Sequence, residues 1–233
     1  MLDREIVQAK VWGELACFTR PEAKVERVSY PVMTPSAARG VLEAICWKPE
    51  FEWYIRRIRV LRPIQFTSIR RNEVQGVLPE ASVKAWMADP GSFEPYLADS
   101  AGREGLQGEN RTQRNTLALR DVAYVIEASV RLRQTGDAGL LRKYREMFLR
   151  RLAKGQCFHH PYLGIREYAA DFGEPSDTDS PVSDTRDLGL MLLDVRHGPK
   201  SHKEPIFASA RLDAGVLDVE AMWHESEGRV DGQ

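Results

Sequence analysis

The feature that most constrains the fold is one short helical segment, TPSAARGVLEAICWKP. Thr34 is a residue type that caps helix N-termini, and Pro35 suits the first helical position. Four apolar residues follow at the spacing of one helix face: Ala38, Val41, Leu42 and Ile45. Because Pro49 disfavours helical geometry at Lys48, we expect a helix that ends near Trp47 and packs its apolar face on a core.

Alternating hydrophobicity predicts three strands around this helix. The first covers Ile6 to Phe18, with a bulge at Gly13. The second follows the helix, and its apolar positions change phase between Ile55 and Ile58, which indicates a β-bulge. The third strand, Val122 to Leu132, has the clearest alternation.

A second, basic helix is predicted over LLRKYREMFLRRLAKG, with Gly155 as its C-terminal stop, and the apolar start of another strand follows it. This order of elements is that of an α+β, ferredoxin-like domain. We place that domain in residues 1–166, with an insertion of weak signal around 67–116 that we expect to be loop. Residues 167–233 form a C-terminal β-rich extension.

Three predictions concern the extension. DFGEPSDTDSPVSDTRD is acidic and rich in Ser and Pro, which favours a mobile loop. LGLMLLDV and IFASARLDAGVLDV are expected to be strands, the second with a turn at Asp213-Ala214-Gly215. The last ten residues are polar and are expected to fray.

Charge is unevenly divided along the chain, although the net charge is only -1. Up to Arg166 there are 27 Lys and Arg against 19 Asp and Glu, and from Glu167 onward there are 6 against 15. The basic first part indicates a surface for a polyanion, and scattered solvated charges are the alternative.

Composition places the chain among globular proteins that work in a reducing compartment. Three scattered cysteines without a C-x-x-C pair argue against a disulfide framework and a zinc site. No apolar run is long enough to span a membrane, and the N-terminus lacks the apolar core of a signal peptide. We therefore expect a cytoplasmic protein with no membrane association.

Four motifs occur in order between Val7 and Met222: KVERVSYPVMTPSAARGVLEAICWKP, RRNEV, LRDVAYVIEA and LGIREY. In this combination the chain resembles the d subfamily of the fifth CRISPR-associated (Cas) protein family, of subtype I-C, within the RAMP superfamily of RNA-binding proteins. The resemblance implies an RNA-recognition-motif-like, ferredoxin-like domain with a C-terminal antiparallel β-sheet extension. It also implies cleavage of CRISPR repeat hairpin RNA without metal or cofactor, retention of the 5′ handle, and assembly with other type I-C Cas subunits.

The resemblance also implies catalytic positions. The family has an aromatic or imidazole side chain late in the first helix and a Lys-His pair early in the second, which correspond here to Cys46 and to Lys143-Tyr144. Cys46 thus stands where relatives have Tyr or His, and Tyr144 stands where they have His, so Lys143 alone keeps its type. A tyrosine, with an ordinary pKa of about 10, is a poor base at neutral pH, and simple core packing is the alternative for Tyr144.

His159-His160 are the alternative acid–base groups, because an imidazole titrates near pH 7. Adjacent side chains of an extended segment point to opposite sides, so at most one of the two could act on a given phosphate. The other histidines, at positions 197, 202 and 224, lack the spacing of metal ligands, so no metal site is expected.

RNA binding should use phosphate contacts together with stacking on flat side chains. The candidate residues are Lys24, Arg27, Tyr30, Arg39, Trp47, Lys48, Arg70, Arg71, Arg114, Arg150 and Lys154. Two other functions remain open on the sequence alone. One is a non-catalytic crRNA-binding scaffold, and this chain's lack of both the family's Tyr or His in the first helix and its His in the second helix would fit that function. The other is a protein that binds double-stranded DNA.

Overall fold

The computed structural model describes residues 6–23, 25–74, 76, 78–93, 111–133, 138–197 and 203–230. The chain forms two compact units. The first comprises Met1–Thr67 and Leu117–Gln233, and the second comprises Ser68–Thr116.

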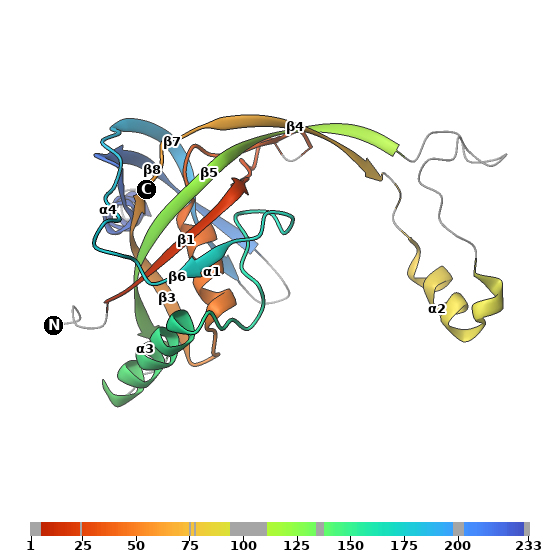
Figure 1. Cartoon of the computed structure of the whole chain (residues 1–233), viewed down its shortest axis with the longest axis horizontal. Helices are drawn as coiled ribbons and strands as arrows, with labels where there is room; N and C mark the ends of the chain where they lie inside the picture. The colour runs from red at the N-terminus through yellow and green to blue at the C-terminus, as the bar shows by residue number, and fades with distance from the viewer. Residues whose placement is uncertain are drawn as a thin grey trace. The chain divides into compact units, whose positions relative to one another are not determined.

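The first unit is a mixed α/β structure built on a curled antiparallel sheet (Figure 1). Its strands pair in the order β6-β1-β5-β3-β9-β8-β7, and β2 pairs with β5. The C-terminal strands therefore continue the sheet through the pairing of β9 with β3. The strands are β1 (Ile6–Ala16), β2 (Arg27–Val28), β3 (Phe51–Val60), β5 (Arg111–Leu132), β6 (Asp171–Gly173), β7 (Arg186–His197), β8 (Lys203–Asp213) and β9 (Val216–Asp218).

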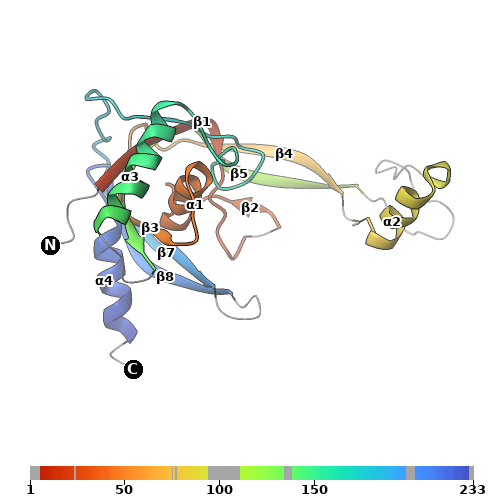
Figure 2. The same ribbon diagram turned by 90° about the horizontal axis from the view of Figure 1, so that it is seen from below.

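Two helices, α1 (Pro35–Ile45) and α3 (Ala138–Ala153), pack on one face of this sheet (Figure 2). The predicted cap of α1 is confirmed, since the Thr34 hydroxyl accepts a hydrogen bond from the Ala37 N–H at 3.2 Å. Gly155, with φ +62°, follows the end of α3 as predicted. Aromatic rings on α3 pack against aromatic rings on the first half of β3. The ring centroids of Tyr144 and Phe51 are 4.9 Å apart, and those of Phe148 and Trp53 are 4.7 Å apart.

The two bulge predictions have opposite outcomes. The register of β3 against β5 shifts between Ile55 and Arg57, so the bulge predicted from the change of phase is confirmed. The bulge predicted at Gly13 is wrong, because β1 keeps one register along β5. A Cβ at Gly13 would lie 2.7 Å from Leu163 Cδ1 and 2.9 Å from the Ala169 carbonyl oxygen. Glycine is therefore needed there for close packing and not for a kink.

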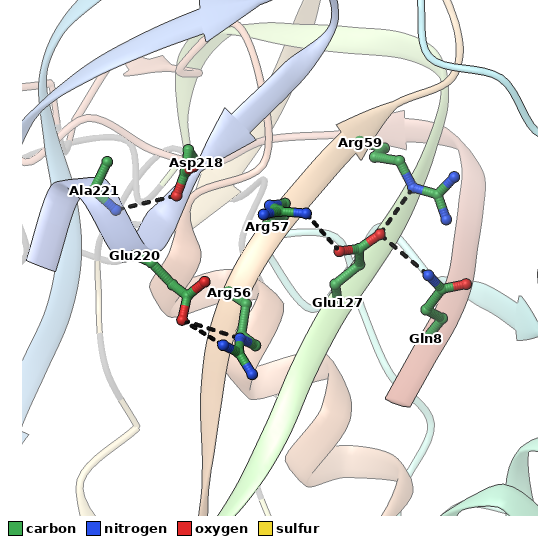
Figure 3. A network of polar contacts seen from close by, with 8 residues as sticks. All are labelled: Gln8, Arg56, Arg57, Arg59, Glu127, Asp218, Glu220 and Ala221. Carbon is green, nitrogen blue, oxygen red and sulfur yellow. Dashed lines mark hydrogen bonds and ion pairs between the residues drawn. The ribbon is translucent and has the colours of Figure 1, made fainter. Parts of the chain in front are cut away.

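The last ten residues were predicted to fray. For residues 224–230 this prediction is wrong, because Val219–Val230 forms helix α4, and residues 231–233 lie outside the described residues. Asp218 accepts a hydrogen bond from the Ala221 N–H at 3.0 Å, as an N-cap does (Figure 3). Glu220 is 2.9 Å from the Arg56 guanidinium on β3. The predicted turn before β9 is confirmed, with Ala214 and Gly215 both at positive φ.

The acidic segment after α3 begins with the short strand β6, which pairs with β1. Beyond it, Asp179 forms an ion pair with Lys10 at 2.5 Å. The Val182 N–H donates to the Val60 carbonyl at 2.9 Å, and this segment is thereby held against the sheet.

The second unit was predicted as loop, and this prediction missed its regular structure. It contains most of β4 (Phe66–Val74), helix α2 (Glu80–Ala88), the short 3-10 helix η1 (Pro90–Ser92) and the first residues of β5. Neither β4 nor α2 has a buried residue. Packing within it includes an edge-on contact of Trp86 with Phe93, with centroids 5.2 Å apart.

Candidate functional site

The C-terminal end of α1, where the predicted catalytic residue Cys46 lies, is contacted by several other segments. The last carbonyls of a helix have no partner within the helix, and here they bind groups from three other segments. Arg151 on α3 donates to the Ile45 carbonyl at 2.8 Å. The Trp53 indole donates to the Cys46 carbonyl at 2.9 Å.

The Ala44 carbonyl accepts from two successive backbone N–H groups, those of Phe158 at 2.8 Å and His159 at 3.3 Å. These contacts fix the His159-His160 segment at the end of α1. Both imidazoles are exposed. The structure thus brings the backbone of the alternative acid–base pair to the C-terminal end of α1.

Two exposed aromatic rings lie on the same segments. The Trp47 side chain follows directly after α1 and is 46% exposed, and Phe158 is 75% exposed. The Phe158 and His159 rings meet edge to face with centroids 5.8 Å apart. Exposed flat rings of this kind are platforms on which unpaired bases stack.

Helix α3 supplies the cations of the site. Arg151, in the last turn of the helix, contacts the end of α1 by donating to the Ile45 carbonyl. Lys143 is exposed, with its Nζ 5.6 Å from the centroid of the Tyr144 ring. Arg150 and Lys154 are exposed at the end of α3, and Lys48 is exposed after α1.

Two of the predicted catalytic side chains are inside the protein. Cys46 has no exposed surface, and burial raises the pKa of its thiol despite the opposing effects of Arg151 and Lys48. Tyr144 is 5% exposed and packs on Phe51, which is the packing role weighed for it above.

Three predicted RNA contacts lie away from the end of α1. Arg39, on the second turn of α1, is 2.6 Å from Asp194. Arg27 lies 3.9 Å from Glu167. Tyr30 is buried under the Arg20 guanidinium, and burial is the main cause that raises the pKa of its phenol.

The remaining predicted contacts are divided between the second unit and the residues that are not described. Arg70 donates to the Asn115 side chain at 3.4 Å, and Arg71 donates to the Thr116 hydroxyl at 3.3 Å. Arg114 is half-buried on β5. Lys24 lies outside the described residues.

Sequence reasoning missed Arg151 and Phe158. The capping of α1 by Arg151 is a contact between residues 106 positions apart, and no local pattern announces it. Phe158 could have been noticed as a large apolar residue inside the otherwise polar stretch GQCFHH. Across the described ranges, no three His, Cys, Asp or Glu side chains lie close enough to hold a metal ion, and none of the described helices is long and apolar enough to cross a membrane.

Comparison with known proteins gives concordant results. The family described as CRISPR-associated protein (Cas_Cas5) matches residues 6–231. A protein of Mannheimia succiniciproducens named CRISPR pre-crRNA endoribonuclease Cas5d is 43% identical over 235 residues, which cover 96% of this chain and 98% of that protein. A Thermus thermophilus protein of the same name is 41% identical over 245 residues, which cover 97% and 96%.

Two solved structures have a similar fold at 21% sequence identity. A functionally uncharacterized Streptococcus mutans protein, SMU1763c, aligns with a TM-score of 0.59 over 91% of each chain. A CRISPR-associated protein aligns with a TM-score of 0.60 over 91% of this chain and 90% of its own.

The curled antiparallel sheet with its two helices is therefore that of a CRISPR-associated protein of the Cas5 family. Within that family, the match over nearly the whole chain places it in the Cas5d group, so the resemblance seen in the sequence motifs is confirmed.

Proposed function

We propose that this protein cleaves precursor CRISPR RNA within its repeat, without a metal ion, and then holds the 5′ handle of the product in a type I-C complex with other Cas subunits. The observation that carries this proposal is the end of α1, where two exposed imidazoles, exposed cations and two exposed aromatic rings lie together. The names of the two Cas5d relatives, which align over nearly their whole length, support the reaction class.

The reaction requires two proton transfers and one stabilised anion. A base removes the proton of a ribose 2′-hydroxyl, and the 2′-oxygen attacks the adjacent phosphorus. The bond from phosphorus to the 5′-oxygen then breaks, and an acid protonates that oxygen. The products are a 2′,3′-cyclic phosphate and a 5′-hydroxyl end.

We assign Lys143 to the negative charge that develops on the phosphoryl oxygens, because the family resemblance implies this position and its side chain is exposed on α3, the helix whose Arg151 contacts the end of α1. The Tyr144 ring lies 5.6 Å from that ammonium and positions it. The family's role for Cys46 fits poorly with proton transfer at neutral pH, because burial raises the pKa of the thiol. His159 is the better proton carrier, since its backbone is fixed on Ala44 and its ring is exposed.

The finer fold assignment supports an RNA-binding role. The elements β1, α1, β3, β5, α3 and β6 occur in this order along the chain, with β2 before α1 and with β4, α2 and η1 between β3 and β5. Their strands lie side by side as β6-β1-β5-β3. With α1 and α3 on one face, this is the arrangement of a ferredoxin-like domain. We infer that the first unit is such a domain, extended by β9, β8 and β7.

RNA would follow the exposed cations that surround this site. Lys48, Arg150 and Lys154 would contact phosphates, and Trp47 would stack on an unpaired base. In the second unit, Arg70, Arg71 and Arg114 add positive charge along the paired strands. A crRNA-binding scaffold without activity is the second candidate, and the burial of Cys46 and Tyr144 is the observation that favours it.

The test is incubation of the protein with its cognate repeat RNA in excess EDTA. The variants are Lys143→Ala, Tyr144→Phe, Cys46→Ser and His159→Ala, with Lys203→Ala, an exposed lysine on β8, as the control. We expect one cut with a cyclic-phosphate end, abolished by Lys143→Ala and His159→Ala and retained by Lys203→Ala.

Two other outcomes would change the assignment. If Cys46→Ser or Tyr144→Phe abolishes cleavage while His159→Ala retains it, the family's positions act directly and our assignment of His159 is wrong. If the wild type binds the hairpin more tightly than random duplex DNA at matched salt but leaves it whole, the protein is the scaffold. Loss of cleavage in EDTA alone would refute the metal-independent reaction.

A further inference from the structure

A polar pocket lies beside the first half of β3. Strand β9 pairs with β3 only at Arg57, Ile58 and Arg59. The preceding residues of β3 are not covered by β9 on this edge, and they border the pocket. The cavity has a volume of about 200 Å³. It is enclosed by the start of α1, by β7 and by α4, and its walls include Pro35, Arg39, Glu52, Tyr54, Asp194 and Trp223.

The walls of the pocket are flat and partly aromatic. The Tyr54 and Trp223 rings are nearly parallel, with an interplanar angle of 26° and centroids 6.3 Å apart. The Arg131 guanidinium lies 3.4 Å from the centroid of the Tyr54 ring. Arg131 therefore covers one face of the Tyr54 ring, and Trp223 is stacked on the same ring. A flat ligand would contact the edge of this stack or the outer face of the Trp223 indole, since bases are held on aromatic side chains of this kind.

Ion pairs hold the helix that carries Trp223. Figure 3 shows Arg56 on β3 reaching Glu220 on α4, with distances of 3.0 Å from Nε and 2.9 Å from Nη2. Asp218 caps the same helix at its first turn. The aromatic wall on α4 is therefore fixed to the strand that carries the Tyr54 ring.

The rim of the pocket has charges of both signs. Arg39 forms an ion pair with Asp194 at 2.6 Å, and another oxygen of this carboxylate accepts from the Val195 N–H at 2.6 Å. Glu52 is exposed on β3, and its backbone lies opposite Arg131 on β5. A ligand in the pocket thus meets guanidinium groups and a carboxylate with accessible oxygens.

The volume limits the ligand to one ring system. Pockets for drug-sized ligands have about 300–1,000 Å³, whereas a cavity of about 150 Å³ already holds a benzene ring. A flat ring against Tyr54 and Trp223 and an anion on Arg131 would satisfy both the aromatic wall and the positive rim. A nucleotide has both groups.

We propose that this pocket binds one unstacked ribonucleotide, with its base against Tyr54 and Trp223 and its phosphate at Arg131. The inference rests on the proposed RNA-binding function but concerns a different place. The pocket touches the first two turns of α1, and the candidate catalytic site lies at the other end of this helix, about 15 Å away by helix rise.

The pocket also predicts a preference among bases. Guanine presents two neighbouring N–H donors on one edge, which match the two acceptor oxygens of the Glu52 carboxylate. Uracil presents a single N–H donor between two carbonyl oxygens. Since a bidentate contact discriminates by about 1–3 kcal/mol, we expect a guanine nucleotide to bind about tenfold more tightly than a uracil nucleotide.

The test uses the full chain with 5-fluorotryptophan at its 5 tryptophans. Trp223→Phe assigns one fluorine resonance, and the protein is then titrated with GMP and with UMP. We expect GMP to shift the Trp223 resonance in a saturable manner and UMP to need about tenfold more nucleotide. Trp86, in the second unit, provides the control resonance that stays in place.

Two variants make the result specific. Glu52→Gln should reduce the affinity for GMP to that for UMP, and Tyr54→Leu should abolish the shift of Trp223. Trp86→Leu is the matched control and should leave the titration unchanged. The fluorine spectrum of each variant is recorded before titration. The variant is folded if only the resonances of the substituted position and its neighbours differ from those of the wild type.

The inference is overturned if the Trp223 resonance stays in place with both nucleotides, if Trp47 moves instead, or if Glu52→Gln leaves the preference for GMP unchanged. Cleavage of repeat RNA is a separate readout. If the protein cleaves RNA while Trp223 does not respond, the pocket assignment alone fails. If Trp223 responds while RNA stays whole, the proposed catalytic function fails and the pocket stands.

Discussion

Arg151 offers a direct test of how the end of α1 is built. Its Nη1 donates to the Ile45 carbonyl at 2.8 Å, in a partly buried contact. Arg151→Met keeps most of the aliphatic packing but leaves this carbonyl without its charged donor. A hydrogen bond to a charged group contributes about 1.5–3 kcal/mol, and a cation at a helix C-terminus adds about 0.3–1 kcal/mol. We therefore expect the free energy of unfolding to fall by about 2–3 kcal/mol.

The neighbouring residue provides the matched control. Arg150 is exposed on the same helix turn, so Arg150→Met should change the free energy of unfolding by at most about 0.5 kcal/mol. The measurement is urea unfolding of both variants, followed by tryptophan fluorescence, at one salt concentration. Equal losses in the two variants would show that the Ile45 carbonyl finds another donor, and the account of how α1 ends would then be wrong.

Further predictions concern two glycines and one ion pair. Gly164 has φ +88°, and a Cβ there would lie 2.0 Å from the Cys17 carbonyl oxygen, so Gly164→Ala should cost at least about 3 kcal/mol in urea unfolding. Gly40 lies within α1 with open space around it, so Gly40→Ala should instead stabilise the protein by about 0.5–1 kcal/mol. The hydrogen bond from Lys10 is the main cause that lowers the pKa of Asp179. The ionised Asp179 carboxylate therefore stabilises the fold at pH values above its unfolded-state pKa of about 3.9. This contribution is lost as the pH falls through the lower folded-state pKa. Asp179→Asn should lower the Tm at pH 7, and calorimetry should show this effect shrinking as the pH falls below about 3.9.

The sequence predicted those parts of the fold whose determinants are local. The cap of α1 depends on Thr34 and Pro35, and the bulge in β3 depends on a change of phase within one strand. Both are properties of a few neighbouring residues, so pattern and structure agree. The turn at Gly215 is predictable for the same reason, because its backbone needs a positive φ.

The elements that were missed have little or no apolar pattern. Strand β4 and helix α2 bury no residue, so neither hydrophobic period could indicate them. Helix α4 is polar over much of its surface and is held by the Arg56–Glu220 ion pair and the Asp218 cap. Contacts between residues far apart in the sequence decide such elements, and propensity alone cannot.

The candidate site was predictable in its ingredients but not in its assembly. Lys143 and the histidine pair could be named from the sequence, whereas the position of the pair depends on the backbone bonds of Phe158 and His159 to Ala44. Burial of Cys46 and Tyr144 likewise follows from the packing of α1 and α3 on the sheet.

The two ends of α1 differ in how their cations are used, and this difference argues for where RNA binds. At the first end, Arg39 is held by Asp194 and by Glu43. At the other end, Lys48, Arg150 and Lys154 are exposed, and among the described residues none of them forms an ion pair. Exposed cations without an ion pair remain available to phosphates, whereas a paired arginine must first leave its carboxylate. A chain of phosphates should therefore follow the C-terminal end of α1, with a single nucleotide reaching the pocket at its start.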